Sequence, residues 1–351
     1  MINLYTPQGW IDVASIKEAA LTFNILMGGR GIGKTYGLLE DLRLNDPRPF
    51  MLMRRTQVQA DLISNPKFSP FKSIDRIRGC CTAVKKLSKY HGGIYNGELD
   101  AQGVLQATGA MLGYTAALTT LHNVRGFAAD EIEDLVLDEF IPEKGEKPIP
   151  DEWNTFRNAY ETINRNREFE DPPRPPLRAW LLANSNTLAN PYFLGLEIVE
   201  LVDKMIRRGQ SVYRDEARGL MIINFTDSPI SARKAQTALY RLTKSDDFTG
   251  MALGNQFTRE SRSRTGSIPL KELLPIVAIG ELQISRHKSS QELYGCMHRF
   301  GAAESYQTDD ASIARFRSRY GWLWEAYMED RILWNTYSAE LVFRKFFGEN
   351  Y

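Results

Sequence analysis

The chain of 351 residues lacks the features that mark secreted and membrane proteins. It has three cysteines: Cys80 and Cys81 are adjacent and Cys296 stands alone, which suits a reducing cytoplasm and argues against a disulfide framework. No run of about 18 apolar residues occurs, so we expect no membrane-spanning helix. The opening residues, MINLYTPQGWIDVAS, lack a positive segment followed by an apolar one, so we expect no secretory signal.

An excess of charge of one sign is also missing. The chain carries 44 basic and 43 acidic residues, a net charge of +1, so only a local cluster could indicate nucleic-acid binding. Residues 62–92 form such a cluster, in which Asp75 is the single acid. This segment is either a solvated face or a surface that follows a phosphate backbone. Its basic residues are Lys67, Lys72, Arg76, Arg78, Lys85, Lys86 and Lys89.

Histidine is scarce and scattered, at positions 91, 122, 287 and 298. Cys296 and His298 have no second pair of ligands, so the sequence offers no zinc site. No Ser/His/Asp arrangement can be argued either. The chemistry must therefore come from other residues.

The clearest motif is a glycine-rich loop. Residues 26–37, LMGGRGIGKTYG, contain the spacing G-x-x-x-x-G-K-[ST], between an apolar run typical of a buried strand (22–29) and a helix pattern from Lys34 to about Leu44. Such a loop surrounds phosphate oxygens with backbone N–H groups, while Lys34 would reach the β and γ phosphates and Thr35 would ligate Mg²⁺. The predicted nucleotide-binding residues are Gly28, Gly29, Arg30, Gly31, Ile32, Gly33, Lys34, Thr35 and Tyr36.

A second motif, DLVLDEF at 134–140, reads as a buried strand that ends in two acids. Asp138 would hold Mg²⁺, directly or through water, and Glu139 would polarise an attacking water. An adjacent glutamate is what a hydrolase needs when it uses ATP for mechanical work. We therefore predict an ATPase rather than a nucleotide kinase.

Other polar residues could complete the site. The strand LLANSN would bring Asn184 beside the γ-phosphate as a sensor of hydrolysis, or Asn184 is a strand-end cap. Arg165 and Arg167, in INRNRE, could reach a neighbouring subunit's γ-phosphate. The alternative is a surface ion pair with Glu168 or Glu170, which would contribute little. Arg30 is the rival arginine finger, acting within its own subunit.

Strands alternate with helices through the first two thirds of the chain, which predicts a parallel α/β sheet with ligand-type residues at strand ends. Further strands are expected at 50–54 and 177–186, helices at 153–167 and 190–208, and a meander or hairpins between Cys80 and Leu121. We divide the chain into an ATPase domain at 1–229, a helical linker at 230–257 and a C-terminal unit at 258–351. That last unit should end in an aromatic-rich helix from about Ala311 to Phe347.

Taken together, several uncommon sequence motifs occur in a fixed order, and in this the chain resembles the DNA encapsidation ATPases of small tailed bacteriophages of the picovirus type. They are GGRGIGKTY, VLDEFIPEK, INRNRE, LLANSN with NPYF, and GNQF, and they span residues from about 22 to 257. The resemblance implies an ASCE-type, RecA-like P-loop motor that works as a homomeric ring, with a pentamer favoured, and pumps double-stranded DNA into a preformed capsid. Its partners would be double-stranded DNA and the portal vertex of the prohead, contacted directly or through a structural RNA. It would act in the cytoplasm of the infected host, with no membrane involved.

The resemblance also implies roles for individual residues. Lys34 and Thr35 would form Walker A, with Asp138 and Glu139 as Walker B and the catalytic glutamate, and Arg165 would act in trans on a neighbour's ATP. Arg125 and Lys144 would face DNA in the pore. Pro142 departs from the family, which has a basic residue there, and this weakens the case for that loop as the main grip on DNA.

Residues 258–351 would resemble an RNase H-like nuclease that has lost its metal-binding acids. An active version needs three or four converging carboxylates, and the segment offers Glu281 in a strand-like run and Asp309 and Asp310 in a loop. We expect an inactive domain that binds nucleic acid or the capsid vertex. Its lead-in either contacts phosphates or is an ordinary flexible linker, and contains Arg259, Arg262 and Arg264.

Three other functions stay open at this point. A terminase with an active nuclease would cut DNA in a metal-dependent way. A self-contained P-loop ATPase or translocase unconnected with packaging would hydrolyse ATP as a monomer. A helicase-like translocase would unwind duplex DNA, but the sequence shows no specific pattern of stacking platforms.

Overall fold

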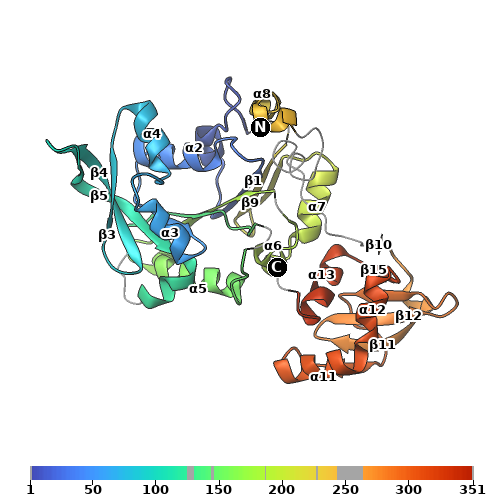
Figure 1. Cartoon of the computed structure of the whole chain (residues 1–351). Coiled ribbons are helices and arrows are strands. Elements are labelled where there is room, and N and C mark those ends of the chain that lie inside the picture. The colour runs from blue at the N-terminus through green and yellow to red at the C-terminus, as the bar shows by residue number, and fades with distance from the viewer. Residues whose placement is uncertain are drawn as a thin grey trace. The chain divides into compact units, whose positions relative to one another are not determined.

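A computed structural model describes residues 2–124, 130–143, 146–185, 187–226, 228–242 and 264–349 (Figure 1). The chain separates into two compact units. One combines Met1–Asn186 with Met205–Thr258, and the other combines Thr187–Lys204 with Arg259–Tyr351. Each unit has its own sheet. The predicted functional division at 229/230 and 257/258 stays a prediction.

The sheet of the first unit has the strand order β3-β4-β5-β2-β6-β7-β1-β9-β8 within the described residues. From β5 to β9 all neighbouring strands are parallel, while β3, β4 and β8 are antiparallel additions. The carboxyl ends of the parallel strands therefore share one edge, where α/β proteins bind ligands. The strands are β1 (Phe23–Gly28), β2 (Phe50–Arg54), β3 (Thr82–Lys86), β4 (His91–Leu99), β5 (Leu105–Ala117), β6 (Asp134–Asp138), β7 (Arg178–Asn184), β8 (Val212–Asp215) and β9 (Leu220–Phe225).

Helices cover the parallel part of this sheet. They are α1 (Val13–Glu18), α2 (Lys34–Glu40), α3 (Gln57–Ile63), α4 (Phe71–Arg78), α5 (Glu152–Asn164), α8 (Pro229–Lys234) and α9 (Ala238–Leu242). The turn Asp41–Asn45, which is π-helical, continues α2. The alternation of strands and helices thus confirms the predicted parallel α/β sheet, and the segment from Cys80 to Leu121 forms the predicted antiparallel hairpins.

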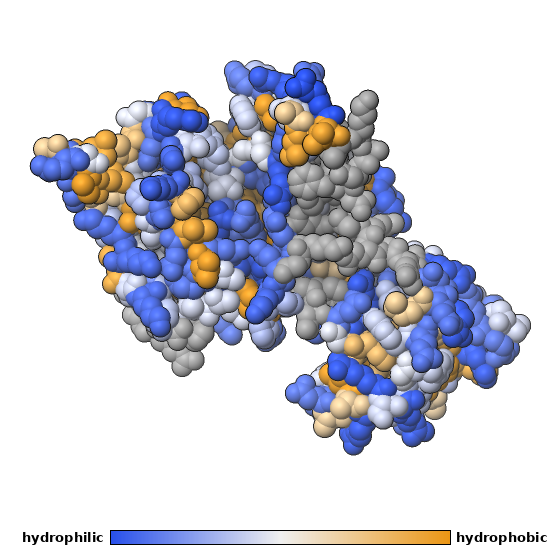
Figure 2. Space-filling view, in the orientation of Figure 1, coloured by the Kyte–Doolittle hydropathy of each residue, from blue (hydrophilic) through white to orange (hydrophobic). Residues whose placement is uncertain are grey.

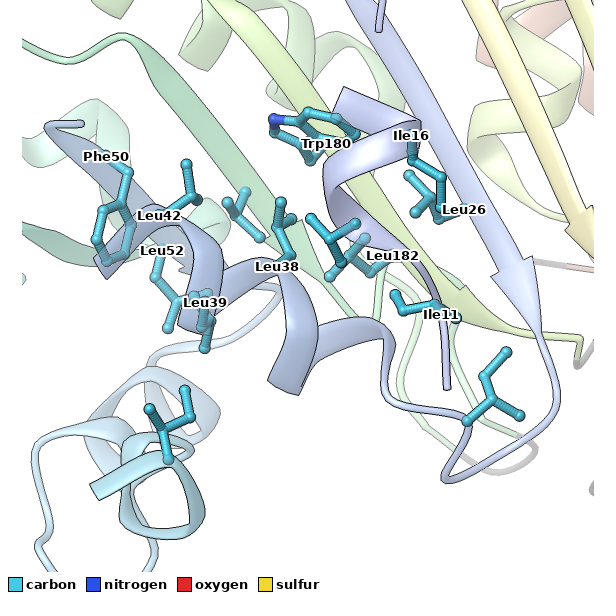
Figure 3. Close-up of a cluster of buried hydrophobic side chains, with 14 of the residues drawn as sticks. Ile11, Ile16, Leu26, Leu38, Leu39, Leu42, Phe50, Leu52, Trp180 and Leu182 are labelled. Carbon is cyan, nitrogen blue, oxygen red and sulfur yellow. The ribbon is translucent and has the colours of Figure 1, made fainter. Parts of the chain in front are cut away.

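One hydrophobic cluster fixes α2 against the strands (Figure 3). Leu38 and Leu42 pack with Leu52 from β2 and with Trp180 and Leu182 from β7, and all are fully buried or nearly so. Burying a side chain of this size stabilises the fold by about 1.5–3 kcal/mol. Because Lys34 is the first residue of α2, this packing also sets where Lys34 stands relative to β1 and β7.

The predicted single helix over 190–208 is wrong. The segment forms α6 (Pro191–Gly195) and α7 (Val199–Arg207), and Glu197 between them has a φ of 58°, which no α-helix contains. The apolar spacing continues across the break, so periodicity alone could not detect it.

The second unit has a sheet of order β10-β15-β13-β12-β11-β14 within the described residues. Strands β11 to β13 are antiparallel neighbours, whereas β14 pairs with β11 and β15 with β13 in parallel. The strands are β10 (Arg264–Thr265), β11 (Leu273–Ile279), β12 (Leu282–His287), β13 (Leu293–Cys296), β14 (Glu304–Tyr306) and β15 (Ile332–Trp334). This is the small α+β unit that the sequence predicts.

Its aromatic-rich end is not the single helix expected from Ala311 to Phe347. It forms α11 (Asp310–Tyr320), α12 (Trp322–Met328) and α13 (Tyr337–Phe346), with β15 inserted before α13. Asp330, with a φ of 57°, lies in the turn that leads into β15. Phe316, Trp334 and Phe343 are buried between the helices and the sheet, so the aromatic residues serve the core.

The face shown in Figure 2 is mainly hydrophilic, with hydrophobic side chains in separate patches. The β4–β5 hairpin contributes exposed apolar residues near its tip, because Leu99 and Val104 are 63% and 53% exposed. Among the described residues, no helix combines the length and the apolarity needed to cross a bilayer.

Candidate nucleotide site

The phosphate loop joins β1 to α2, and glycine is required at several of its positions. Gly31 and Gly33 have φ values of 73° and 98°, which side-chain-bearing residues rarely adopt. At Gly28 a Cβ would lie 2.6 Å from Ile32 Cδ1 and 2.9 Å from Phe225 Cβ. Gly33 is the N-cap of α2 and provides no side-chain cap, so the first N–H groups of that helix stay available to an anion.

Lys34 is buried inside this loop. Its Nζ donates hydrogen bonds to the carbonyl oxygens of Gly28 and Gly29, both at 2.9 Å, and to Asn184 Oδ1 at 3.3 Å. Burial is the main cause that lowers the pKa of Lys34 to about 7; the charges of Lys234 and Arg30 act in the same direction, while Asp138 and Glu139 oppose the shift. An incoming polyanion would favour the charged ammonium and pull it away from the carbonyl groups.

Thr35 and Asp138 meet across the end of β6. Thr35 Oγ1 donates to Asp138 Oδ1 at 2.9 Å, and Asp138 is only 2% exposed. Burial raises the pKa of the Asp138 carboxyl, while the Arg54 guanidinium acts in the opposite direction.

This pair fits Mg²⁺, which prefers oxygen ligands and binds through one or two protein groups together with substrate phosphates and water. The described residues contain no cluster of three or more His, Cys, Asp or Glu side chains suited to a metal ion. A site built on Thr35 and Asp138 therefore depends on the nucleotide to complete it.

Glu139 follows β6 and has a φ of 59°, which directs its side chain away from the strand. Its carboxylate is 51% exposed and forms an ion pair with Arg54 Nη1, while Arg54 Nη2 lies 2.9 Å from Asp138 Oδ2. One guanidinium at the end of β2 therefore holds both acids.

Arg54 is not among the site residues predicted from the sequence. The signal was present, because Arg54 ends the buried strand FMLMR and the carboxyl ends of parallel strands meet at one edge. The sequence alone does not show that β2 lies next to β6. Arg54 could therefore not be placed beside Asp138 and Glu139 before the structure was known.

An open cavity of about 360 Å³ lies between these groups. Asn184, at the end of β7, is paired in register with Gly28 and contributes its amide to the cavity wall. Tyr36 also lines the cavity, but its hydroxyl donates to Glu40 Oε1 at 2.7 Å. The lining residues are Arg30, Gly31, Gly33, Lys34, Thr35, Tyr36, Asp138, Glu139, Ala183 and Asn184. The structure thus brings the predicted Walker A and Walker B residues and Asn184 to one cavity.

The three candidate arginine fingers differ in their surroundings. Arg30 lines the cavity and forms an ion pair with Glu143. Arg165 caps α5 in a left-handed conformation, is 38% exposed along its side chain, and lies 3.4 Å from Asp130 rather than beside the glutamates expected from the sequence. Arg167 is 3% exposed and its guanidinium donates to the carbonyl oxygens of Ile163, Asn164 and Ile132. Arg167 is thus committed to its own fold, which favours Arg165 as the group able to reach a neighbour.

The predicted DNA contacts Arg125 and Lys144 lie outside the described residues, as do Arg259 and Arg262. In the basic cluster of residues 62–92, Arg78 pairs with Glu40 at 2.7 Å and Lys86 with Asp61 at 3.0 Å. Both cations are exposed, but Glu40 is largely buried whereas Asp61 is exposed. The cluster is therefore partly neutralised, and both of its predicted interpretations stay open.

In the second unit, the candidate acids are dispersed. Glu281 lies in the turn between β11 and β12, and Asp309 caps α11 by accepting a hydrogen bond from Ser312 N at 2.9 Å. Asp310 is the first residue of α11 rather than a loop residue. Arg264, in β10, forms an ion pair at 2.7 Å with Glu292, which directly precedes β13.

Comparisons with known proteins identify related sequences and folds. The sequence profile of a family described as Podovirus DNA encapsidation protein (Gp16) matches residues 95–265. The chain is 25% identical to the DNA packaging protein of Bacillus phage phi29 over 265 residues, which cover 74% of this chain and 67% of that protein. The corresponding protein of Bacillus phage PZA is 25% identical over 264 residues, covering 73% of this chain and 67% of its own length.

Solved structures show the same fold. The bacteriophage Phi-29 viral genome packaging motor assembly contains a chain with a TM-score of 0.61 and 16% identity, covering 98% of this chain and 99% of that one. The Phi-28 gp11 DNA packaging motor gives a TM-score of 0.60 at 16% identity, with 99% and 97% covered. These structures support the fold, and the sequence matches confirm the predicted resemblance to the DNA encapsidation proteins.

Proposed function

Because residues 95–265 match the DNA encapsidation proteins of podoviruses, we propose that this chain is an ATPase that drives double-stranded viral DNA into a preformed capsid. The reaction is hydrolysis of ATP to ADP and phosphate. The observation that carries the proposal is the cavity in which a phosphate loop, a buried aspartate and an adjacent glutamate meet. The relatives are DNA packaging proteins, and from them we infer that the hydrolysis drives DNA packaging.

Binding of ATP would replace the carbonyl partners of Lys34 with phosphate oxygens. The ammonium now donates to Gly28 and Gly29, and a charged phosphate oxygen is the stronger acceptor. The N–H groups of the loop and of the first turn of α2 would bind the remaining phosphate oxygens. Thr35 and Asp138 would hold Mg²⁺, which polarises the phosphates and neutralises their developing charge.

Hydrolysis would use Glu139 as the group that orients and deprotonates water. In the structure this carboxylate forms an ion pair with Arg54, which also lies against Asp138. Glu139 must leave Arg54 before it can accept a hydrogen bond from water. Arg54 therefore keeps the site inactive until other contacts replace that ion pair. Asn184, which contacts both Lys34 and the cavity, would respond to the γ-phosphate.

The site would be completed by a second copy of the chain. Arg165 is exposed and does not line the cavity of its own chain, so its guanidinium would approach a neighbour's γ-phosphate by exchanging its present contacts, Asp130 among them. A closed ring would let every subunit supply this residue to the next one, and a pentamer is our working hypothesis. Loss of phosphate would release the interface and move pore-facing residues, for which Arg125 and Lys144 are the candidates.

The remaining assignments follow from this function. We propose residues 1–229 as the ATPase domain, 230–257 as a linker and 258–351 as an inactive nuclease-like domain that binds nucleic acid or the capsid vertex. The motor would act in the host cytoplasm while attached to the portal vertex of the prohead, directly or through a structural RNA. DNA would be held by its phosphate backbone, whose even charge allows movement without reading sequence.

The test is steady-state ATP hydrolysis at increasing protein concentration, with and without double-stranded DNA. We expect specific activity to rise with concentration and with DNA. An Arg165→Ala variant mixed in at constant total protein should inhibit more than in proportion to its share. Activity that is linear in concentration and indifferent to DNA would instead indicate a self-contained ATPase. Cleavage of plasmid DNA with Mn²⁺ would indicate a terminase with an active nuclease.

A further inference from the structure

Helix α8 begins at the same edge of the sheet as the nucleotide site. It follows β9, which runs parallel to β1, and Phe225 at the end of β9 packs against Gly28. The N-terminal segment holds the start of α8: Tyr5 Oη donates to Thr226 O at 2.7 Å, and a Cβ at Gly9 would lie 2.8 Å from Pro229 Cβ. Figure 1 shows the N-terminus beside α8. The position of α8 relative to the phosphate loop is therefore fixed from both sides.

The last residue of α8 contacts the phosphate loop directly. Lys234 Nζ donates to the carbonyl oxygen of Arg30 at 2.5 Å, and it would lie 3.5 Å from a Cβ at Gly31. Both loop residues line the nucleotide cavity. The ammonium also lies 5.2 Å from the centre of the Tyr240 ring, which places α9 on its other side.

Lys234 has no carboxylate within ion-pair distance among the residues that the structure describes. It adds a third cation to Lys34 and Arg30 at this loop, and Glu143 compensates only Arg30. The charge of Lys234 repels the charged form of Lys34 and helps to lower the pKa of Lys34. Like charges gathered around glycine-rich backbone are unfavourable without an anion, and such arrangements are typical of sites that bind one.

We propose that Lys234 is a third phosphate-binding cation of the nucleotide site, supplied by α8 of the same chain. The carbonyl oxygen of Arg30 is a neutral acceptor, and a polyphosphate oxygen would replace it in a stronger, charge-assisted hydrogen bond. Lys234 ends α8 and contacts Tyr240 of α9. Its movement onto the phosphates would therefore change the positions of α8 and α9 when nucleotide binds. This inference rests on the proposed binding of ATP and adds a residue that no P-loop motif contains.

The test measures binding rather than turnover, with the full chain. A fluorescent ATP analogue with Mg²⁺ is titrated against the wild type, Lys234→Gln, Lys234→Arg and Arg233→Gln at several salt concentrations. Arg233 is the matched control, since it is the exposed neighbour on the same helix and its substitution removes the same charge. We expect Lys234→Gln to weaken binding about tenfold and to reduce the salt dependence, because one phosphate contact is lost. Lys234→Arg and Arg233→Gln should stay within about threefold of the wild type.

Each result has one meaning. Equal affinities for Lys234→Gln and Arg233→Gln would overturn the inference while leaving the proposed ATPase intact. A wild-type chain that binds no nucleotide would instead remove the proposed function itself. Thermal unfolding of each variant without nucleotide checks that the fold is kept, and Lys234→Arg tests the role of the cation with the packing largely preserved.

Discussion

At the scale of single residues, the site depends on which partner holds each charged group. Arg54 binds the two acids that hydrolysis requires, and the carbonyl groups of the phosphate loop hold Lys34. These contacts pair the charged groups of the site with protein partners, which under the proposed function phosphate, Mg²⁺ and water would replace.

Replacing Glu139 by glutamine keeps the shape of the side chain and removes the base. We expect ATP turnover to fall by about 10²–10⁴-fold, which is the usual contribution of a general base, whereas nucleotide affinity stays close to that of the wild type. Glu143→Gln is the matched control. It changes turnover by less than about fivefold, because an exposed ion pair contributes at most about 1 kcal/mol. Phosphate release and equilibrium binding measure the two quantities, and similar losses of turnover in both variants would contradict the role of Glu139.

Lys34 makes the affinity for ATP depend on pH. Burial holds the pKa of Lys34 at about 7 in the free chain, while bound phosphates favour the charged form and raise it. The group is thus already protonated below that pH, and above it a proton must be taken up on binding. We expect affinity to fall by up to about tenfold per pH unit from neutral pH upwards.

Calorimetric titrations at pH 8 in buffers of different ionisation enthalpy test this linkage. They should show uptake of close to one proton for each ATP bound. Uptake of no proton at pH 8 would mean that Lys34 keeps its charge in the free chain.

At the scale of elements, the loop can be tested with two glycines of matched conformation. Gly31 in the phosphate loop and Gly103 in the β4–β5 turn have φ values of 73° and 75°, and a Cβ at Gly103 would meet nothing within 4 Å. Substitution by alanine at either position should cost about 1–2 kcal/mol of stability, because left-handed backbone is unfavourable for L-residues. Only Gly31→Ala should also weaken nucleotide binding. Chemical denaturation and nucleotide titration separate the two effects.

Sequence reasoning succeeded where a pattern is local. The strands at Phe23–Gly28 and Asp134–Asp138 and the helix after Lys34 could be predicted, because apolar runs and glycine spacing define them directly. It failed where the chain changes direction inside a continuous apolar pattern, as at Glu197 and before β15. It also missed Arg54, since pairing β2 with β6 is a property of the whole sheet and leaves no local trace.

At the scale of the whole molecule, nucleotide binding should appear as added stability. A ligand present at one hundred times its dissociation constant stabilises a folded protein by about 2.7 kcal/mol. We expect ATP with Mg²⁺ to raise the Tm of the chain, and chelation of Mg²⁺ to remove most of the increase. Asp138→Asn should show little dependence on Mg²⁺, because it loses the carboxylate that faces Thr35. Scanning calorimetry of both chains with ATP, with and without a chelator, measures this; an equal response to Mg²⁺ would exclude Asp138 as its ligand.

The position of β1 has a consequence for synthesis. Among the described strands, β1 pairs with β7 and β9 alone, and both leave the ribosome long after it. A nascent chain that ends before β7 therefore carries the complete glycine loop but has no neighbouring strand to hold it. Such non-local pairing is slow, because the intervening chain must close first. The cavity can form only after β7 and β9 have been synthesised, so a nascent chain that ends before β7 should neither bind nor consume the ATP of the cell that makes it.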